Sequence, residues 1–206
     1  MLKKKLIFTL VGLVAVILLF KFGTTVAPKS KIETPVVSTV KVFDILQFIQ
    51  EEKKHLTSTQ AVSLGKLENS VTRGDVNSQL ITANTQLANF WKDSVQSFEP
   101  YVYYLSEAAK LDKSEKNLTF AAQLILENLR GEQDLAKLNW KTEQAIALFE
   151  KGIELYPNND DLKIGLGSCY VFGKGRAGGP EETMKGIQQL LSVVRKDSNN
   201  MKAQMM

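Results

Sequence analysis

A glycine-rich string in the C-terminal third of the chain could contact phosphate. Gly173, Gly175 and Gly178 have the G-x-G-x-x-G spacing of dinucleotide-binding loops, and Lys174 and Arg176 lie between them as cations. Such a loop works only after a strand and before a helix in a βαβ unit, because the helix N-terminus must receive the pyrophosphate. The residues around this string have helical periodicity instead, so the sequence predicts a flexible loop between two helices and no cofactor.

Histidine and cysteine, the usual residues of catalytic and metal sites, each occur once. His55 follows a charged run near a helix end, where we expect it to be exposed, and a single histidine cannot build a multi-histidine metal site. Cys169 cannot form an internal disulfide and is expected to be a small buried core residue. The acidic pairs at 160–161 and 181–182 are typical of helix N-termini. We therefore predict no catalytic residues, no metal ligands and no enzymatic activity.

Composition places the chain among helical globular proteins with an appendage. The 206 residues are 44% hydrophobic and include only 5 prolines, and long segments have the 3.6-residue period of amphipathic helices. The net charge of +4 arises from lysines that alternate with acidic residues. This pattern is typical of a solvated helical surface and lacks the basic stripe that nucleic-acid binding requires.

The N-terminus predicts a membrane anchor. A lysine cluster within residues 1–5 precedes an uncharged apolar stretch from 6 to 20. That stretch is shorter than the roughly 20 residues of a full span. However, Lys21 can extend its ammonium to the membrane surface, so the apolar segment can continue to residue 26. A cleaved signal peptide is the alternative, and Pro28 argues against it because the nearest small-residue cleavage site directly precedes it.

The whole chain divides into five segments. We expect residues 1–5 to be cytoplasmic, 6–26 to cross the membrane and 27–40 to be a linker, so that the soluble part is periplasmic. Residues 41–76 predict a helical hairpin, which is either a divergent copy of the helix pairs that follow or a cap on them, and residues 77–206 predict a series of further helices. Within residues 77–206 we expect helices at about 142–156, 160–172 and 180–196, with a helix end and loop at 130–140.

The region from Ala145 to Tyr170 carries a recognisable pattern. Ala145, Phe149 and Pro157 are followed by Leu166-Gly167-x2-Tyr170. In order and spacing these residues resemble the tetratricopeptide repeat (TPR) signature. The resemblance implies an all-α fold, a TPR-like α-solenoid of antiparallel helix pairs. The small residues would lie where two helices approach closely, and the signature packing positions would be Ala145, Phe149, Gly152, Pro157, Leu166, Gly167, Tyr170, Gly186 and Leu190.

A second copy of the pattern follows at an offset of 41 residues. Gly186 and Leu190 repeat Ala145 and Phe149, and residues 198–200 repeat 157–159. Because the usual period is about 34 residues, we expect the extra residues in the glycine-rich loop. The resemblance covers roughly 77–206, and its last repeat is incomplete. We therefore expect a fragment of a longer array.

The resemblance also implies a function. In TPR proteins the first helices of successive units line a concave groove that holds a peptide or a partner helix. By that resemblance Asp161, Ile164, Ser168 and Phe172 would face such a groove. Repeats of the carboxylate-clamp type have Lys and Asn at two of these positions, where this chain has Ile164 and Ser168, so a more apolar protein ligand is expected.

The sequence thus predicts a membrane-anchored scaffold for protein–protein contacts. Two alternatives remain open. The first is a periplasmic assembly factor, similar to the TPR subunits of cytochrome c maturation, that presents a client protein. The second is the tether of an enzyme domain that lies beyond residue 206.

Overall fold

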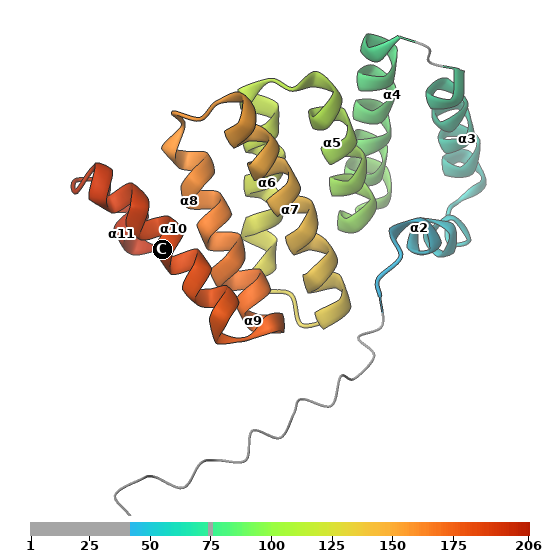
Figure 1. Cartoon of the computed structure of the whole chain (residues 1–206). Helices are drawn as coiled ribbons and strands as arrows, with labels where there is room; N and C mark the ends of the chain where they lie inside the picture. The colour runs from blue at the N-terminus through green and yellow to red at the C-terminus, as the bar shows by residue number, and fades with distance from the viewer. Residues whose placement is uncertain (1–41, 74–75) are drawn as a thin grey trace, which may run out of the picture. The chain divides into compact units, whose positions relative to one another are not determined.

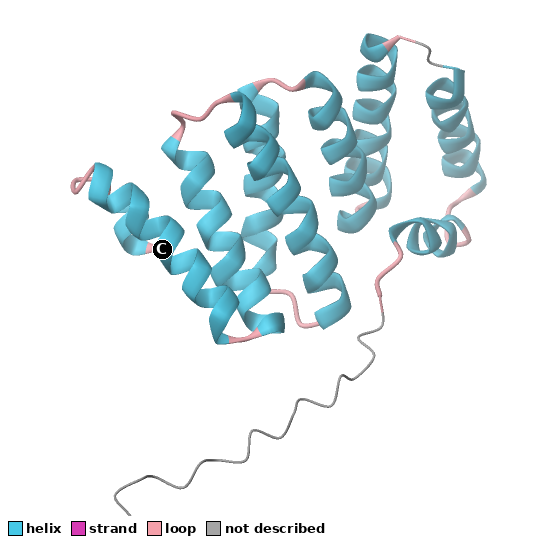
Figure 2. Ribbon diagram, viewed as in Figure 1, coloured by secondary structure: helices cyan, strands magenta, loops and turns pink. Residues whose placement is uncertain are grey.

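The computed structural model describes residues 42–73 and 76–206, and every regular element in these residues is a helix (Figures 1 and 2). The all-α prediction is confirmed. The elements are α2 (Ile45–Lys53), α3 (Ser58–Arg73), α4 (Asn77–Asn89), the π-helix η1 (Phe90–Val95), α5 (Phe98–Asp112), α6 (Glu115–Leu129), α7 (Leu135–Leu155), α8 (Asp160–Cys169), the π-helix η2 (Tyr170–Lys174), α9 (Gly175–Gly178), α10 (Pro180–Lys196) and α11 (Met201–Met205).

The helices from α4 onward form consecutive antiparallel pairs. A short loop joins α6 to α7, whereas η1 leads from α4 to α5 and η2 with α9 leads from α8 to α10. The two helices of each pair lie side by side (Figure 1). Each pair stacks on the next, since α5 contacts α6 and α7 contacts α8. The first helices of neighbouring pairs, α6 and α8, also touch, as do the second helices α5 and α7. The result is a regular array in which each pair covers the apolar side of its neighbour.

Local sequence explains where several helices begin. Thr57 and Gln60 form a capping box: the backbone N–H of Gln60 donates to the Thr57 hydroxyl, and the backbone N–H of Thr57 donates to the Gln60 side chain. Asp134 accepts from the first backbone N–H groups of α7, and Asn159 accepts from Leu162 at the start of α8. Pro180 occupies the first turn of α10, where no N–H is needed.

Three apolar clusters lie along the array. The largest joins α5, α6, α7 and α8 and includes the fully buried Leu118, Leu138 and Phe149. A second, around Trp91, joins α2, α3, α4 and α5. A third, around Ile164, joins α8, α10 and α11.

Glycines allow the closest helix contacts in the C-terminal half. A Cβ atom at Gly152 would lie 2.9 Å from the Leu162 side chain, and one at Gly167 would lie 3.0 Å from the carbonyl oxygen of Gly186. A Cβ atom at Gly165 would overlap the ring of Phe149. Any larger residue would push the helices apart, because no flexible group can yield at the Gly186 backbone.

Two helix boundaries differ from the sequence prediction. The segment 130–140 is not mainly a loop: α7 begins at Leu135, directly after its Asp134 cap. The segment 173–179 is not a flexible loop, because η2 and α9 continue the path of α8 to Gly178. Gly179, with φ at 92°, then makes the turn into α10, a conformation that favours glycine.

Among the described residues, no helix is both long and apolar enough to cross a bilayer. The predicted cytoplasmic N-terminus, anchor and linker, residues 1–5, 6–26 and 27–40, lie outside the described part of the chain.

Candidate functional site

The four residues predicted to face a groove have different surroundings. Asp161 is exposed, and its carboxylate lies 2.6 Å from Lys202 Nζ. Ile164 is only 1% exposed and belongs to the apolar cluster of α8, α10 and α11. Ser168 is fully buried, and its hydroxyl donates to the Ile164 carbonyl at 2.8 Å. In this arrangement only Asp161 and Phe172 keep surface with which to contact a ligand.

Phe172 lies beneath a cation. The guanidinium carbon of Arg130 is 4.2 Å from the centre of the Phe172 ring, a cation–π contact. The Nη2 nitrogen of the same guanidinium donates to Met206 Sδ at 3.4 Å. Arg130, directly after α6, therefore contacts η2 through Phe172 and also contacts Met206, which follows α11.

Arg130 also ends a stripe along α6. Residues spaced by four, three, four and three positions lie on one side of a helix, and this stripe comprises Lys116, Phe120, Gln123, Glu127 and Arg130. All are exposed except the half-buried Gln123, and Phe120 is 53% exposed. We call this stripe the α6 face. It presents an aromatic ring between charged side chains of both signs.

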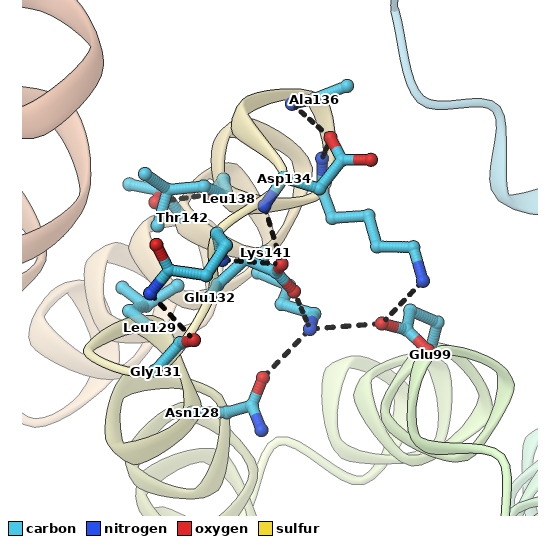
Figure 3. Close-up of polar contacts among 12 residues, drawn as sticks. Glu99, Asn128, Leu129, Gly131, Glu132, Asp134, Ala136, Leu138, Lys141 and Thr142 are labelled. Carbon is cyan, nitrogen blue, oxygen red and sulfur yellow. Dashed lines mark hydrogen bonds and ion pairs between the residues drawn. The ribbon is translucent and has the colours of Figure 1, made fainter.

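A buried lysine connects several polar side chains from neighbouring helices (Figure 3). Lys141 Nζ, on a side chain only 3% exposed, lies 2.8 Å from Asn128 Oδ1, 2.6 Å from Glu132 Oε2 and 3.0 Å from Glu99 Oε1. Lys137 Nζ approaches the same oxygen of Glu99 at 3.3 Å. The cluster joins α5, the C-terminal end of α6, the loop after it and α7.

The lysine lowers the pKa of both glutamates. Burial raises the pKa of Glu99, but the hydrogen bond and the charge of Lys141, assisted by Lys137, outweigh it and hold the pKa below its ordinary value. Burial likewise raises the pKa of Glu132, and the hydrogen bonds from Lys141 and from the backbone of Asp134 and Gln133 outweigh it. Both carboxylates are therefore held in their charged form.

This cluster is arranged to connect helices. An ammonium has three hydrogens to donate, and Lys141 has three acceptors within reach: Asn128, Glu132 and Glu99. No hydrogen is left for a substrate, and the side chain has almost no exposed surface. The nearby cavity of ≈ 270 Å³ lies between α2 and α7 and is lined by Lys137 and Phe48, without Lys141.

A polar hollow separates α3 from α4. Its volume is ≈ 540 Å³, and the side chains around it carry amides, hydroxyls and one ammonium. They are Lys66, Asn69, Ser70, Ser78, Gln79, Thr82, Ala83 and Gln86. Most of these residues are exposed, so the hollow is open to solvent.

The two cations of the glycine-rich string, Lys174 and Arg176, both bind acceptors on other helices or loops of the protein. Arg176 donates to the carbonyl oxygens of Leu129 and Glu132, both at 2.8 Å, and so covers the C-terminal end of α6. Lys174 forms an ion pair with Glu143. Gly173 is buried against Thr142. The string thus fastens the end of α8 to α6 and α7.

Sequence reasoning missed Lys141, Glu99, Glu132 and Arg176. One signal was present: Lys141 lies three residues after Leu138 and four before Ala145, so it occupies the apolar stripe of α7. A lysine in that stripe indicates a buried partner. The partners themselves come from other helices, and no local pattern identifies them.

The signature positions lie at helix contacts in the C-terminal half. Ala145 and Phe149 are fully buried, Gly152 lies against Leu162, and Gly186 approaches the carbonyl oxygen of Gly167. Pro157 stands exposed in the turn after α7, whereas Leu166, Tyr170 and Leu190 pack into the neighbouring clusters.

Comparison of this chain with protein-family models, curated proteins and solved structures found no match. Within residues 42–73 and 76–206, no group of three or more histidine, cysteine, aspartate or glutamate side chains could hold a metal ion.

Proposed function

We propose that this chain is a membrane-anchored scaffold of the TPR type that binds another protein along the α6 face, without catalysis. The observation that carries the proposal is the stripe from Lys116 to Arg130, in which Phe120 is 53% exposed between charged residues. Aromatic and arginine side chains are enriched at protein interfaces and supply much of their binding energy.

The helix array supports the TPR interpretation. The pairs α6–α7 and α8–α10 pack through small residues, with Gly152 against Leu162 and Gly167 against Gly186. The helices α6 and α8 are the first helices of their pairs and touch each other. In TPR proteins these first helices line the binding surface, so the resemblance directs attention to the same side that carries Phe120 and Arg130.

The proposed ligand is a polypeptide with an apolar side chain and a nearby carboxylate. Phe120 offers a ring for apolar contact, and the Arg130 guanidinium, held over Phe172 at 4.2 Å, offers planar N–H donors that suit a carboxylate. Because cation–π contact fixes the guanidinium, less rotamer freedom is lost when the ligand binds.

Crosslinking in native membranes tests this proposal. The full chain, a Phe120→Lys/Arg130→Glu variant and a Val62→Lys variant are each crosslinked, purified and analysed by quantitative mass spectrometry. Val62 on α3 is 60% exposed and serves as a matched control for adding a lysine to a surface apolar position. We expect a protein that is recovered with the parent and with Val62→Lys and depleted at least several-fold with the double variant. Identical recovery from all three would exclude binding through the α6 face.

Membrane attachment is proposed from the sequence alone and needs its own test. The segment 6–26 would hold the helices at the periplasmic side of an inner membrane. After alkaline carbonate extraction we expect the full chain in the membrane pellet and a chain that lacks residues 1–26 in the supernatant. A soluble full chain of unchanged mass would contradict an anchor, and a soluble chain of lower mass would indicate a cleaved signal peptide.

A further inference from the structure

The outer side of α10 carries apolar side chains that the helix array does not cover. Met184 is 53% exposed, Ile187 38% and Leu191 42%, while the opposite side of α10 buries Gly186 and Leu190 against α8. Two different sides of one helix are thus apolar, and the array uses only one of them.

Comparison with α7 shows that pair stacking does not require Met184 or Leu191, whereas Ile187 corresponds to Ile146, which is buried in the array. At the internal offset of 41 residues, Met184 corresponds to Glu143 and Leu191 corresponds to Glu150, and both glutamates are exposed. The same side of the preceding second helix is therefore charged. Met184 and Leu191 have no apolar counterpart in α7, so the stacking of helix pairs does not explain why these two positions are apolar.

Charge is arranged with opposite signs at the two ends of this stripe. Glu181, Met184, Gln188, Leu191 and Arg195 are all exposed and follow one another at spacings of three, four, three and four, so they share one side of α10. Within the described residues, neither Glu181 nor Arg195 belongs to an ion pair. Along α10, the five side chains of this stripe are in turn acidic, apolar, an amide, apolar and basic.

Two copies of this stripe are complementary when they run in opposite directions. When two such helices lie antiparallel with their midpoints at Gln188, each Met184 meets a Leu191 and each Glu181 meets an Arg195. The two Gln188 amides meet at the centre, where each can donate to and accept from the other. A parallel pair would instead place Glu181 beside Glu181 and Arg195 beside Arg195, which costs free energy.

We propose that α10 is a homodimer surface: a second copy of this chain packs its α10 antiparallel against the first, around a two-fold axis at Gln188. Closed two-fold symmetry makes the same patch serve both copies. Two copies anchored in one membrane would then present two α6 faces to their ligands, which raises the effective concentration of the binding site.

Disulfide crosslinking of the full chain in native membranes tests the proposed two-fold axis at Gln188. Gln188→Cys is expected to give a covalent dimer on a non-reducing gel after mild oxidation, because the axis brings the two substituted side chains together. Ala147→Cys is the matched control, since Ala147 is exposed at the equivalent position of α7. The native Cys169 is fully buried and should give no background. Equal dimer yields from the two variants, or none from Gln188→Cys, would overturn the proposal.

Charge reversal distinguishes a second copy from any other occupant of the stripe. In the Gln188→Cys background, Glu181→Arg or Arg195→Glu alone should lower the dimer yield several-fold, because like charges then meet at both ends. The double reversal should restore it. Coexpression of the two single variants, each with its own epitope tag, should give mainly mixed dimers.

Failure of the double reversal to restore the dimer would mean that the stripe binds something other than a second copy and would refute the proposal. Circular dichroism of each purified variant checks that the helices are intact. The α6-face variants should leave the dimer yield unchanged, so this result and the proposed ligand binding can fail independently.

Discussion

The ammonium of Lys141 lies 2.6 Å from Glu132 Oε2 and thereby connects the middle of α7 to the loop that precedes it. The same nitrogen reaches Glu99 on α5, at 3.0 Å. One buried charge therefore holds three segments that belong to two neighbouring helix pairs. Its environment compensates the cost of burial with two carboxylates and an amide.

Replacement of Lys141 by methionine should destabilise the fold strongly. The methionine would fill similar space but leave Glu99 and Glu132 without their common partner, and breaking a buried pair costs roughly 3–5 kcal/mol. Urea unfolding followed by circular dichroism measures the loss. Lys151→Met on the same helix is the control, because Lys151 pairs with Glu154 at the surface and such pairs contribute about 1 kcal/mol or less. Equal losses from the two variants would contradict a structural role for the cluster.

Acid should weaken the fold through the same two glutamates. Because the folded-state pKa values of Glu99 and Glu132 lie below the ordinary 4.5, the stabilisation is complete above about pH 4.5 and is lost as pH falls through the lowered values. The free energy of unfolding of the parent should therefore decline below pH 4.5, and a Glu99→Gln/Glu132→Gln variant should decline less steeply. Urea titrations at several pH values give both slopes.

In the Lys141→Met variant the free energy of unfolding should change with pH in the opposite direction, which tests the role of the ammonium directly. Without the ammonium, the burial that raises the pKa of both glutamates loses its strongest opposing cause, so both carboxyl groups are protonated more easily. The stability difference between the parent and Lys141→Met should shrink as pH falls from 7 to 4. A difference that stays constant over this range would show that the two carboxylates do not titrate against Lys141.

Helix-forming segments could be predicted from the sequence because their signals are local. The period of apolar residues predicted a helix at about 180–196, and the acidic pair at 181–182 indicated its start; both agree with α10. The start of α7 was predicted several residues too late. The Asp134 cap, which the structure shows accepting from Ala136 and Lys137, was a readable signal for the true start.

The rest depended on contacts between distant residues. The glycine-rich string looks flexible by composition, yet Arg176 bonds to carbonyl oxygens 47 and 44 positions earlier and holds it in helical form. Ile164 looks like a surface residue on the signature pattern, but packing with Leu190 and Val193 buries it. No property of a local stretch reveals such partners, because tertiary packing decides them.

Removal of the Arg176 guanidinium should loosen the end of α6. In Arg176→Gln the carbonyl oxygens of Leu129 and Glu132 lose their donors, and hydrogen bonds that involve a charged group contribute about 1.5–3 kcal/mol each. We expect a loss of unfolding free energy of ~1–3 kcal/mol and faster hydrogen exchange confined to the end of α6 and the start of α7. Lys92→Gln, which removes an exposed cation on η1, is the control. Unchanged exchange at Leu129 would mean that Arg176 contributes nothing to this helix end.

Two glycine-to-alanine substitutions distinguish the effect of close helix packing on stability from the effect of helix propensity. Gly165 and Gly65 both lie inside helices, and alanine is the better helix former by about 1 kcal/mol. A Cβ atom at Gly65 meets nothing within 4 Å, whereas a Cβ atom at Gly165 would overlap the buried ring of Phe149. Gly65→Ala should therefore raise the free energy of unfolding by roughly 0.5–1 kcal/mol.

Gly165→Ala should have the opposite effect. To admit the methyl group, Phe149 must leave its position or α8 must move away from α7, and overpacking of this kind costs typically 1–3 kcal/mol. The shift should also loosen the Gly167 contact with the Gly186 carbonyl, because Gly167 lies on the same short helix. Urea unfolding of the parent and both variants measures the two changes. A gain at both positions would show that α7 and α8 do not approach as closely as the Gly165–Phe149 contact requires.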